Sequence, residues 1–118
     1  MNDESKKHIN DMAQLIYDKK GSNIIAIDIS SISSLTDGVI LAEGTIDRHV
    51  IALAKSIIEE MKKRGQSPHY VDGLQNGDWI IIDYMDFMIH IFIPSFRELY
   101  QLEMLWSAGD LMELEIKT

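Results

Sequence analysis

The residues of this sequence that come nearest to catalytic chemistry lie around one acidic position, Asp28. The pair Gly21-Ser22 forms a small turn that could hold a phosphate, and Asp28 follows six residues later on a predicted strand. Two-metal phosphoryl transfer needs paired carboxylates to bind Mg²⁺, spaced as D-x-D on one strand. The matching triplet here, at 28–30, reads D-I-S and lacks the second carboxylate. The pattern indicates the scaffold of such a site without its chemistry, unless Asp72 or Asp83 lies nearby in the fold.

Other patterns of catalysis and metal binding are absent from the sequence. The four histidines are never spaced i, i+4, and the chain has no cysteine to act as a ligand or nucleophile. There is no G-x-S-x-G, P-loop or G-x-G-x-x-G motif, and the serines at 30–34 are typical of a turn. His90 lies in the middle of an apolar strand, which favours a structural or interface role. We therefore expect no metal, no cofactor and no enzymatic activity.

The first part of the chain predicts one helix and two short strands. Apolar residues at helical spacing predict a helix over 5–20, ended by Gly21 in the left-handed conformation. An isoleucine-rich run at 23–29 predicts a strand that is buried on both faces. A second short strand is predicted at 39–42, after a turn-rich loop.

The middle of the chain predicts a second helix and a hairpin. Thr45 is the predicted N-cap of the helix, and Gly65 is predicted to end it. Residues 68–72 predict a weak strand. The segments 79–84 (WIIIDY) and 87–93 (FMIHIFI) predict strong strands, and only two residues separate them. They therefore predict a tight antiparallel hairpin.

A third helix is predicted to begin at Ser95, whose side chain would form a capping box with Glu98. Apolar residues continue to Trp106, and residues 107–118 form a tail with room for one more short element. The order α-β-β-α-β-β-β-α predicts a single α/β domain, bordering on α+β, with a mixed sheet of about five strands flanked by helices. The predicted organisation is a domain at 1–106 followed by the tail.

The charges are unevenly distributed along the chain. It carries 11 basic and 19 acidic side chains, a net charge of −8, which argues against a broad nucleic-acid-binding surface. Residues 71–118 hold nine acidic and two basic side chains, a net charge of −7. No apolar run is long enough to span a membrane, and the polar N-terminal segment is unlike a signal peptide. Together with the absence of cysteine, these features predict a cytoplasmic protein.

Three blocks of sequence stand out by their order and spacing. They are G-T-x-D-R-H-V at 44–50, W-x-x-x-D-Y-x-D-x-x-x-H-x-F at 79–92 and R-E-L-Y-x-L-E-x-L-W at 97–106. Together they resemble the ribosomal silencing factor family, also called Iojap-like. The resemblance covers about residues 5–106, which is nearly the whole chain.

The resemblance implies a nucleotidyltransferase-like α/β fold without the catalytic site. Members of the family bind the large ribosomal subunit through ribosomal protein L-fourteen, on the face that meets the small subunit. They thereby block subunit joining sterically and lower translation when nutrients are short, and several form homodimers. This chain departs from the family at Met85, where D-Y-G-D is usual, and at Gly38, where a larger side chain is usual. Methionine resists the positive φ of a two-residue primed turn at a cost of about 1 kcal/mol, so another type of turn is expected.

Charge and strand alternation predict where the partner would bind. The acidic second half would be steered towards a basic ribosomal protein and away from RNA. Alternation places Trp79, Ile81 and Asp83 on one face of their strand, and a carboxylate beside a tryptophan indicates a face that is not purely core. A core role remains the alternative for Trp79 and for Trp106. The predicted contact residues are Trp79, Asp83, Tyr84, Met85, Asp86, Tyr100, Glu103 and Trp106.

Two other functions remain open from the sequence. One is a small Mg²⁺-dependent nucleotidyltransferase-like enzyme that uses Asp28 and a second carboxylate. Calorimetry with ATP and Mg²⁺ would detect it. The other is a homodimeric adaptor for a different protein target, which sedimentation with purified large subunits would distinguish from a silencing factor.

Overall fold

The computed structural model describes the backbone of all 118 residues and all side chains except those of Leu99, Tyr100, Leu102 and Leu105. The helices are α1 (Asp3–Asp18), α2 (Asp47–Lys63), α3 (Pro94–Tyr100) and the 3₁₀ helix η1 (Leu102–Trp106). The strands are β1 (Ser22–Asp28), β2 (Gly38–Glu43), β3 (Tyr70–Asp72), β4 (Trp79–Asp83), β5 (Phe87–Phe92) and β6 (Asp110–Leu111). None of the described helices is both long and apolar enough to cross a membrane.

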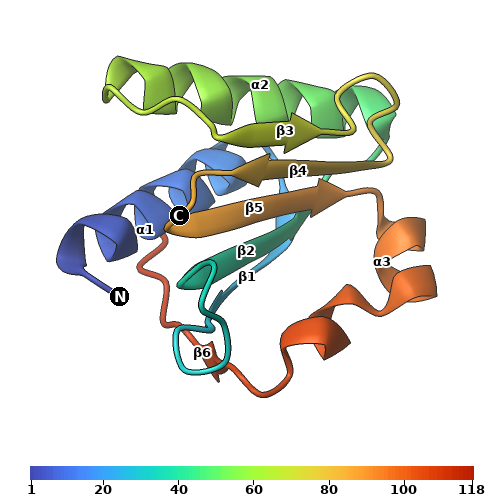
Figure 1. Ribbon diagram of the computed structural model, residues 1–118. Coiled ribbons are helices and arrows are strands. Elements are labelled where there is room, and N and C mark those ends of the chain that lie inside the picture. Colours follow the sequence, from blue (N-terminus) through green and yellow to red (C-terminus); the bar gives the residue numbers. More distant parts are fainter.

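The strands form one mixed sheet in the order β3-β4-β5-β2-β1-β6. Strands β2 and β5 are parallel, and the remaining pairs are antiparallel. Helices α1 and α2 lie together on one face of the sheet, whereas α3 and η1 follow the end of β5 (Figure 1). The predicted α/β class with a mixed sheet is confirmed. The sheet has six strands rather than about five because the tail contributes β6.

Helix α1 begins earlier than predicted, and a different residue from the predicted one adopts the left-handed conformation at its end. The Asn2 side chain accepts a hydrogen bond from the Ser5 amide (2.8 Å), which caps the helix at its N-terminus. At the other end Lys20, with φ of 73°, takes the left-handed conformation that was predicted for Gly21. Gly21 is needed for a different reason, because a Cβ there would collide with the side chain of Ile16. The prediction of a left-handed Gly21 is therefore wrong.

Helix α2 starts without the predicted Thr45 cap. Ile46 occupies the N-cap position and makes no side-chain capping bond. Instead, Nδ1 of His49 accepts a hydrogen bond from the Thr45 amide (2.9 Å), and its Nε2 lies 2.8 Å from the carbonyl oxygen of Lys19. This arrangement requires a neutral ring protonated at Nε2 and ties the start of α2 to the end of α1. At the far end, the prediction for Gly65 is confirmed by its φ of 79°.

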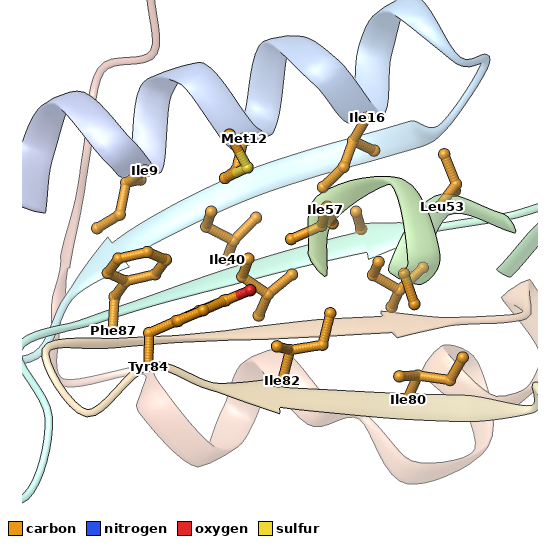
Figure 2. Packing of buried hydrophobic residues seen from close by; sticks show 14 of the residues in the cluster. Ile9, Met12, Ile16, Ile40, Leu53, Ile57, Ile80, Ile82, Tyr84 and Phe87 are labelled. Carbon is orange, nitrogen blue, oxygen red and sulfur yellow. The ribbon is translucent and has the colours of Figure 1, made fainter. Parts of the chain in front are cut away.

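The main core lies between the two long helices and the sheet. Isoleucine and methionine side chains of α1 point towards the apolar side chains of β4 and β5 (Figure 2). Apolar side chains of α2 belong to the same cluster. Strand β2 is buried along its whole length because it lies between β5 and β1 in the sheet. Strand β1 was predicted to be buried on both faces, which is wrong for its first half, since Ser22 and Asn23 are exposed.

The predicted hairpin joins β4 to β5. The Tyr84 amide donates to the Phe87 carbonyl (2.9 Å), and only Met85 of the two turn residues has a positive φ, at 70°. The Asp86 amide donates to the Tyr84 carbonyl (2.9 Å), and such an i→i+2 hydrogen bond across a residue with a positive φ is typical of a γ-turn centred on Met85. A carboxylate oxygen of Asp83 accepts a hydrogen bond from the Met85 amide (2.7 Å) and helps to hold this conformation. The expectation of a turn other than the primed two-residue type is therefore confirmed, and Met85 still adopts a positive φ within it.

Helix α3 is shorter than predicted and lacks the capping box. Pro94 occupies its first turn, and Ile93 stands at the N-cap without a side-chain bond, so the Ser95–Glu98 prediction is wrong. The helix ends where Gln101 adopts a left-handed conformation with φ of 47°. The 3₁₀ helix η1 then continues the chain.

The C-terminal tail is bound to the rest of the fold by backbone hydrogen bonds. Strand β6 pairs with β1, and the following segment runs along α1. The Asn10 side chain exchanges two hydrogen bonds with the backbone of Glu115, and Gln14 does the same with Lys117. Because Asn10 and Gln14 are one helical turn apart, they match alternate residues of the extended tail.

Candidate partner-binding surface

The sheet face away from α1 and α2 has a smaller apolar cluster of its own. Buried side chains of β1, β2 and β5 form this cluster, and Trp79, Phe96 and Trp106 pack against it while remaining partly exposed. We call this side of the sheet the aromatic face. It is covered by α3 and η1 rather than by a long helix.

A pair of aromatic rings organises the centre of the aromatic face. The indole Nε1 of Trp79 donates a hydrogen bond to Nδ1 of His90 (3.0 Å), so the His90 proton lies on Nε2. His90 is only 3% exposed, and this burial lowers the pKa of its ring to about 4, against the opposing effect of the Asp83 carboxylate. The His90 and Trp106 ring centroids are 5.1 Å apart. His90 is therefore neutral at pH 7 and fixes the orientation of Trp79.

A buried ion-pair network connects α3 to the sheet at one edge of the aromatic face. The guanidinium of Arg97, 9% exposed, donates from Nη1 to Glu43 on β2 (2.9 Å) and from Nε to Glu103 on η1 (3.0 Å). Its Cζ atom lies 5.4 Å from the centroid of the Phe92 ring. Arg97 thus joins two carboxylates from different elements and stacks on the apolar cluster.

Five of the predicted contact residues lie on the aromatic face or in the hairpin turn. Trp79, Asp83 and Trp106 are partly exposed, and Trp79 and Trp106 pack on the same cluster of the aromatic face. Met85, 58% exposed, and Asp86 form the hairpin turn. Trp79 lies at the start of β4 and Met85 follows its end after Tyr84, so about six residue steps, or roughly 20 Å at about 3.3 Å per residue, separate Trp79 from this turn.

The remaining predicted contact residues lie on η1, in the main core or outside the described side chains. Glu103 is exposed on η1, beside Arg97. Tyr84 is 8% exposed and points into the main core beside Phe87, where burial raises the pKa of its phenol to about 12 (Figure 2). The Tyr100 side chain lies outside the described residues. The surface therefore includes Trp79, Asp83, Met85, Asp86, Glu103 and Trp106 but not Tyr84.

Two residues that support this surface, His90 and Arg97, were not among the predicted contact residues, although a structural or interface role was predicted for His90. His90 could have been found, because the hairpin register pairs Ile81 with His90 and so brings the ring close to Trp79. The Arg97 network could not, since its partner Glu43 is 54 residues away in the chain.

The carboxylate that phosphoryl-transfer chemistry would require is not supplied by the predicted candidates. Asp83 lies on β4, and three strand spacings, or about 14 Å, separate β4 from the strand of Asp28, β1. Asp72 lies on β3, which is one strand further away. Asp110 of β6 stands opposite Asp28 instead. The Asp28 carboxylate accepts hydrogen bonds from the hydroxyl and amide of Ser30, which lower its pKa. Among the described residues, no group of three or more His, Cys, Asp or Glu side chains is arranged to hold a metal ion.

This fold is a small α/β domain with one face of its sheet closed by two long helices and with an aromatic face on the other side. Comparison with known proteins assigns it more narrowly. A model of the family described as "Ribosomal silencing factor during starvation" matches residues 2–118, and the chain belongs to this family.

Individual relatives agree with this assignment. The chain is 40% identical over 88 residues to "Ribosomal silencing factor RsfS" of Haemophilus influenzae, which covers 75% of this chain and 86% of that protein. It is 34% identical over 95 residues to the protein of the same name from Chromobacterium violaceum, covering 80% of this chain and 78% of that protein. A crystal structure of a protein from Chromobacterium violaceum superposes with a TM-score of 0.80 at 31% identity, covering 94% of this chain and 92% of that one.

Proposed function

We propose that this protein associates with the ribosome and silences translation. The family match over residues 2–118 is the single observation that carries this proposal, because it spans every element of the fold. The relatives matched in Haemophilus influenzae and Chromobacterium violaceum are named as ribosomal silencing factors. In finer terms, we propose that the protein binds the large subunit through ribosomal protein L-fourteen in the cytoplasm and so prevents joining of the small subunit.

The aromatic face has the composition expected of a surface that binds a protein. Tryptophan is one of the residue types that are enriched among those contributing most of the binding energy of protein interfaces. Trp79 is anchored by His90, and Trp106 packs beside it. Asp83 follows on the same strand, and Asp86 and Glu103 are exposed on the hairpin turn and on η1, so these acidic side chains favour a basic protein surface over phosphate.

The proposed mechanism is occupancy, without a bond being made or broken. The domain measures 33 × 33 × 30 Å, so a bound copy would fill a large part of the space into which a second subunit must fit. A standard protein interface buries about 800 Å² on each partner. The protein exposes 6932 Å² in total, so one face can supply that area. Silencing by occupancy therefore requires affinity and position but no cofactor.

The proposal is tested by titrating the protein into a subunit-joining assay with purified large and small subunits. We expect the fraction of joined subunits to fall as the protein binds large subunits, and we expect binding to weaken as salt is raised. Failure to sediment with large subunits would reject ribosome association and favour a homodimeric adaptor for another target. Binding without any effect on joining would reject the occupancy mechanism. Binding that is insensitive to salt would reject only its electrostatic part.

A further inference from the structure

Polar contacts connect η1 to the sheet. A cavity of about 980 Å³ lies where α3 and η1 meet the start of β1 and the end of β2. Its walls include Asn23, Ile25, Glu43, Arg97, Glu103 and Met104. The hydrogen bonds and ion pairs that cross this open edge therefore contribute to the position of η1.

Arg97 makes the hydrogen bonds that cross this edge. Besides Glu43 and Glu103, its Nη1 donates to the carbonyl oxygen of Asn23 (2.6 Å), and Asn23 in turn donates from its side chain to Glu43 (3.1 Å). The guanidinium therefore connects β1, β2 and η1 from its place on α3. The planar guanidinium of arginine can donate hydrogen bonds to several acceptors at once in this way, whereas the ammonium group of lysine cannot donate to the same acceptors in the same geometry.

Two of the strained backbone positions in the molecule adjoin Arg97. Asn23 has φ of 49° and offers its carbonyl to the Arg97 side chain, and Gln101 has φ of 47° and donates its amide to the Arg97 carbonyl (2.9 Å). Left-handed conformations of such residues are unfavourable and persist where the surrounding structure imposes them. Gln101 is also the junction between α3 and η1, and its hydrogen bond to residue 97 joins backbone groups, so the guanidinium acts on η1 through Glu103 instead.

We propose that Arg97 is a positioning residue for the partner-binding surface. By holding Glu103 and stacking on Phe92, it fixes the segment that places Trp106 against His90. The inference rests on the proposed function, since the surface it organises is the one proposed to meet the ribosome. Arg97 itself is buried and acts through Glu103 and Trp106, not through contact with the partner.

The test compares Arg97→Lys with Glu98→Gln. Glu98 is the matched control because it is exposed on the same helix, lines the same cavity and makes none of the described ion pairs. Two readouts are taken on each folded variant: the indole N–H resonance of Trp106, assigned with Trp106→Phe, and sedimentation with large subunits. For Arg97→Lys we expect a shifted or broadened Trp106 resonance and at least tenfold weaker binding. For Glu98→Gln we expect an unchanged resonance and binding within about twofold of wild type.

An unchanged Trp106 resonance and unchanged binding in Arg97→Lys would overturn the inference. If Arg97→Lys does not fold, Glu103→Gln decides, because it removes the exposed carboxylate and leaves the buried pair of Arg97 and Glu43 intact. A shifted Trp106 resonance in that variant supports the inference, and an unchanged one overturns it. The wild-type protein could fail to bind large subunits while the Trp106 resonance still shifts in Arg97→Lys. In that case the positioning role of Arg97 stands and the proposed function fails.

Discussion

The two faces of the sheet differ in how completely they are covered. On one face, α1 and α2 bury a continuous core in which the side chains of β4 and β5 have no access to solvent at Ile80, Ile82, Ile89 and Ile91. On the aromatic face, the same two strands carry Trp79, Ile81, Asp83 and Met88, all partly exposed. A single hairpin therefore supplies both the rigid core and the surface available to a partner.

This difference separates residues that hold the fold from residues that can serve a function. Alternation along a strand sends neighbouring residues to opposite faces, so adjacent substitutions should have effects of different kinds. On the helical face they should lower the free energy of unfolding, and on the aromatic face they should lower affinity for the partner.

The largest expected difference in stability is between Ile82→Ala and Ile81→Ala. Ile82 is fully buried under the helices, so its truncation leaves a cavity and should lower the free energy of unfolding by about 3–4 kcal/mol. Ile81 is half-buried on the aromatic face, and its truncation should cost about 1 kcal/mol. Denaturant unfolding of both variants measures the difference, and equal losses would remove the distinction between the two faces.

The buried His90 should make the stability of the aromatic face depend on pH. The pKa of His90 is about 4 in the folded protein against an ordinary value of 6.5 for histidine, so the unfolded chain binds more protons between these values. The contribution of neutral His90 is fully present above pH 6.5 and is lost as the pH falls towards 4, by up to about 3 kcal/mol. Unfolding measured across this range in wild type and His90→Phe isolates the effect, because the carboxylates titrate in both. Parallel pH profiles would contradict it.

Trp79→Ala should affect binding more than folding. An anchored tryptophan at the centre of an interface is worth about 2 kcal/mol, so binding to large subunits should weaken about thirtyfold while the protein stays folded. Lys55→Ala, at an exposed position of α2, is the control and should bind as the wild type does. An unfolded Trp79→Ala protein would assign this residue to the core instead.

The smallest effects are expected at the end of the hairpin. Met85→Gly should raise the free energy of unfolding by about 1 kcal/mol, because glycine adopts a positive φ without the steric cost that methionine bears. The neighbouring Tyr84→Phe should change stability by less than about 1 kcal/mol, since the Tyr84 hydroxyl has no described hydrogen-bond partner. Thermal unfolding measures both. A destabilised Met85→Gly would show that methionine contributes contacts that outweigh its strain.

Sequence patterns predicted the elements of this fold better than their ends. The long helices and the hairpin follow from apolar spacing, which reflects burial on one side of each element. The predicted caps at Thr45 and Ser95 failed because His49 satisfies the Thr45 amide and Pro94 starts α3. The two-residue strand β6 is too short to leave a pattern, and it forms by pairing with β1, which is far away in the sequence.

The same limit applies to the candidate surface. Alternation placed Trp79 and Asp83 on one face, which the structure confirms. It also placed Tyr84 on the opposite face, and that side is the buried core. The Arg97 network joins residues that are 54 and 74 positions apart, and no local pattern indicates such a contact.

The most direct test of the account is hydroxyl-radical footprinting of the protein alone and with saturating large subunits. Oxidation of Trp79 and Trp106 reports on the aromatic face, and oxidation of Tyr17, 40% exposed on α1, reports on the helical side. We predict that the subunit protects both tryptophans at least threefold and leaves Tyr17 unchanged. Protection of Tyr17 with unprotected tryptophans would contradict the central claim that the aromatic face meets the ribosome.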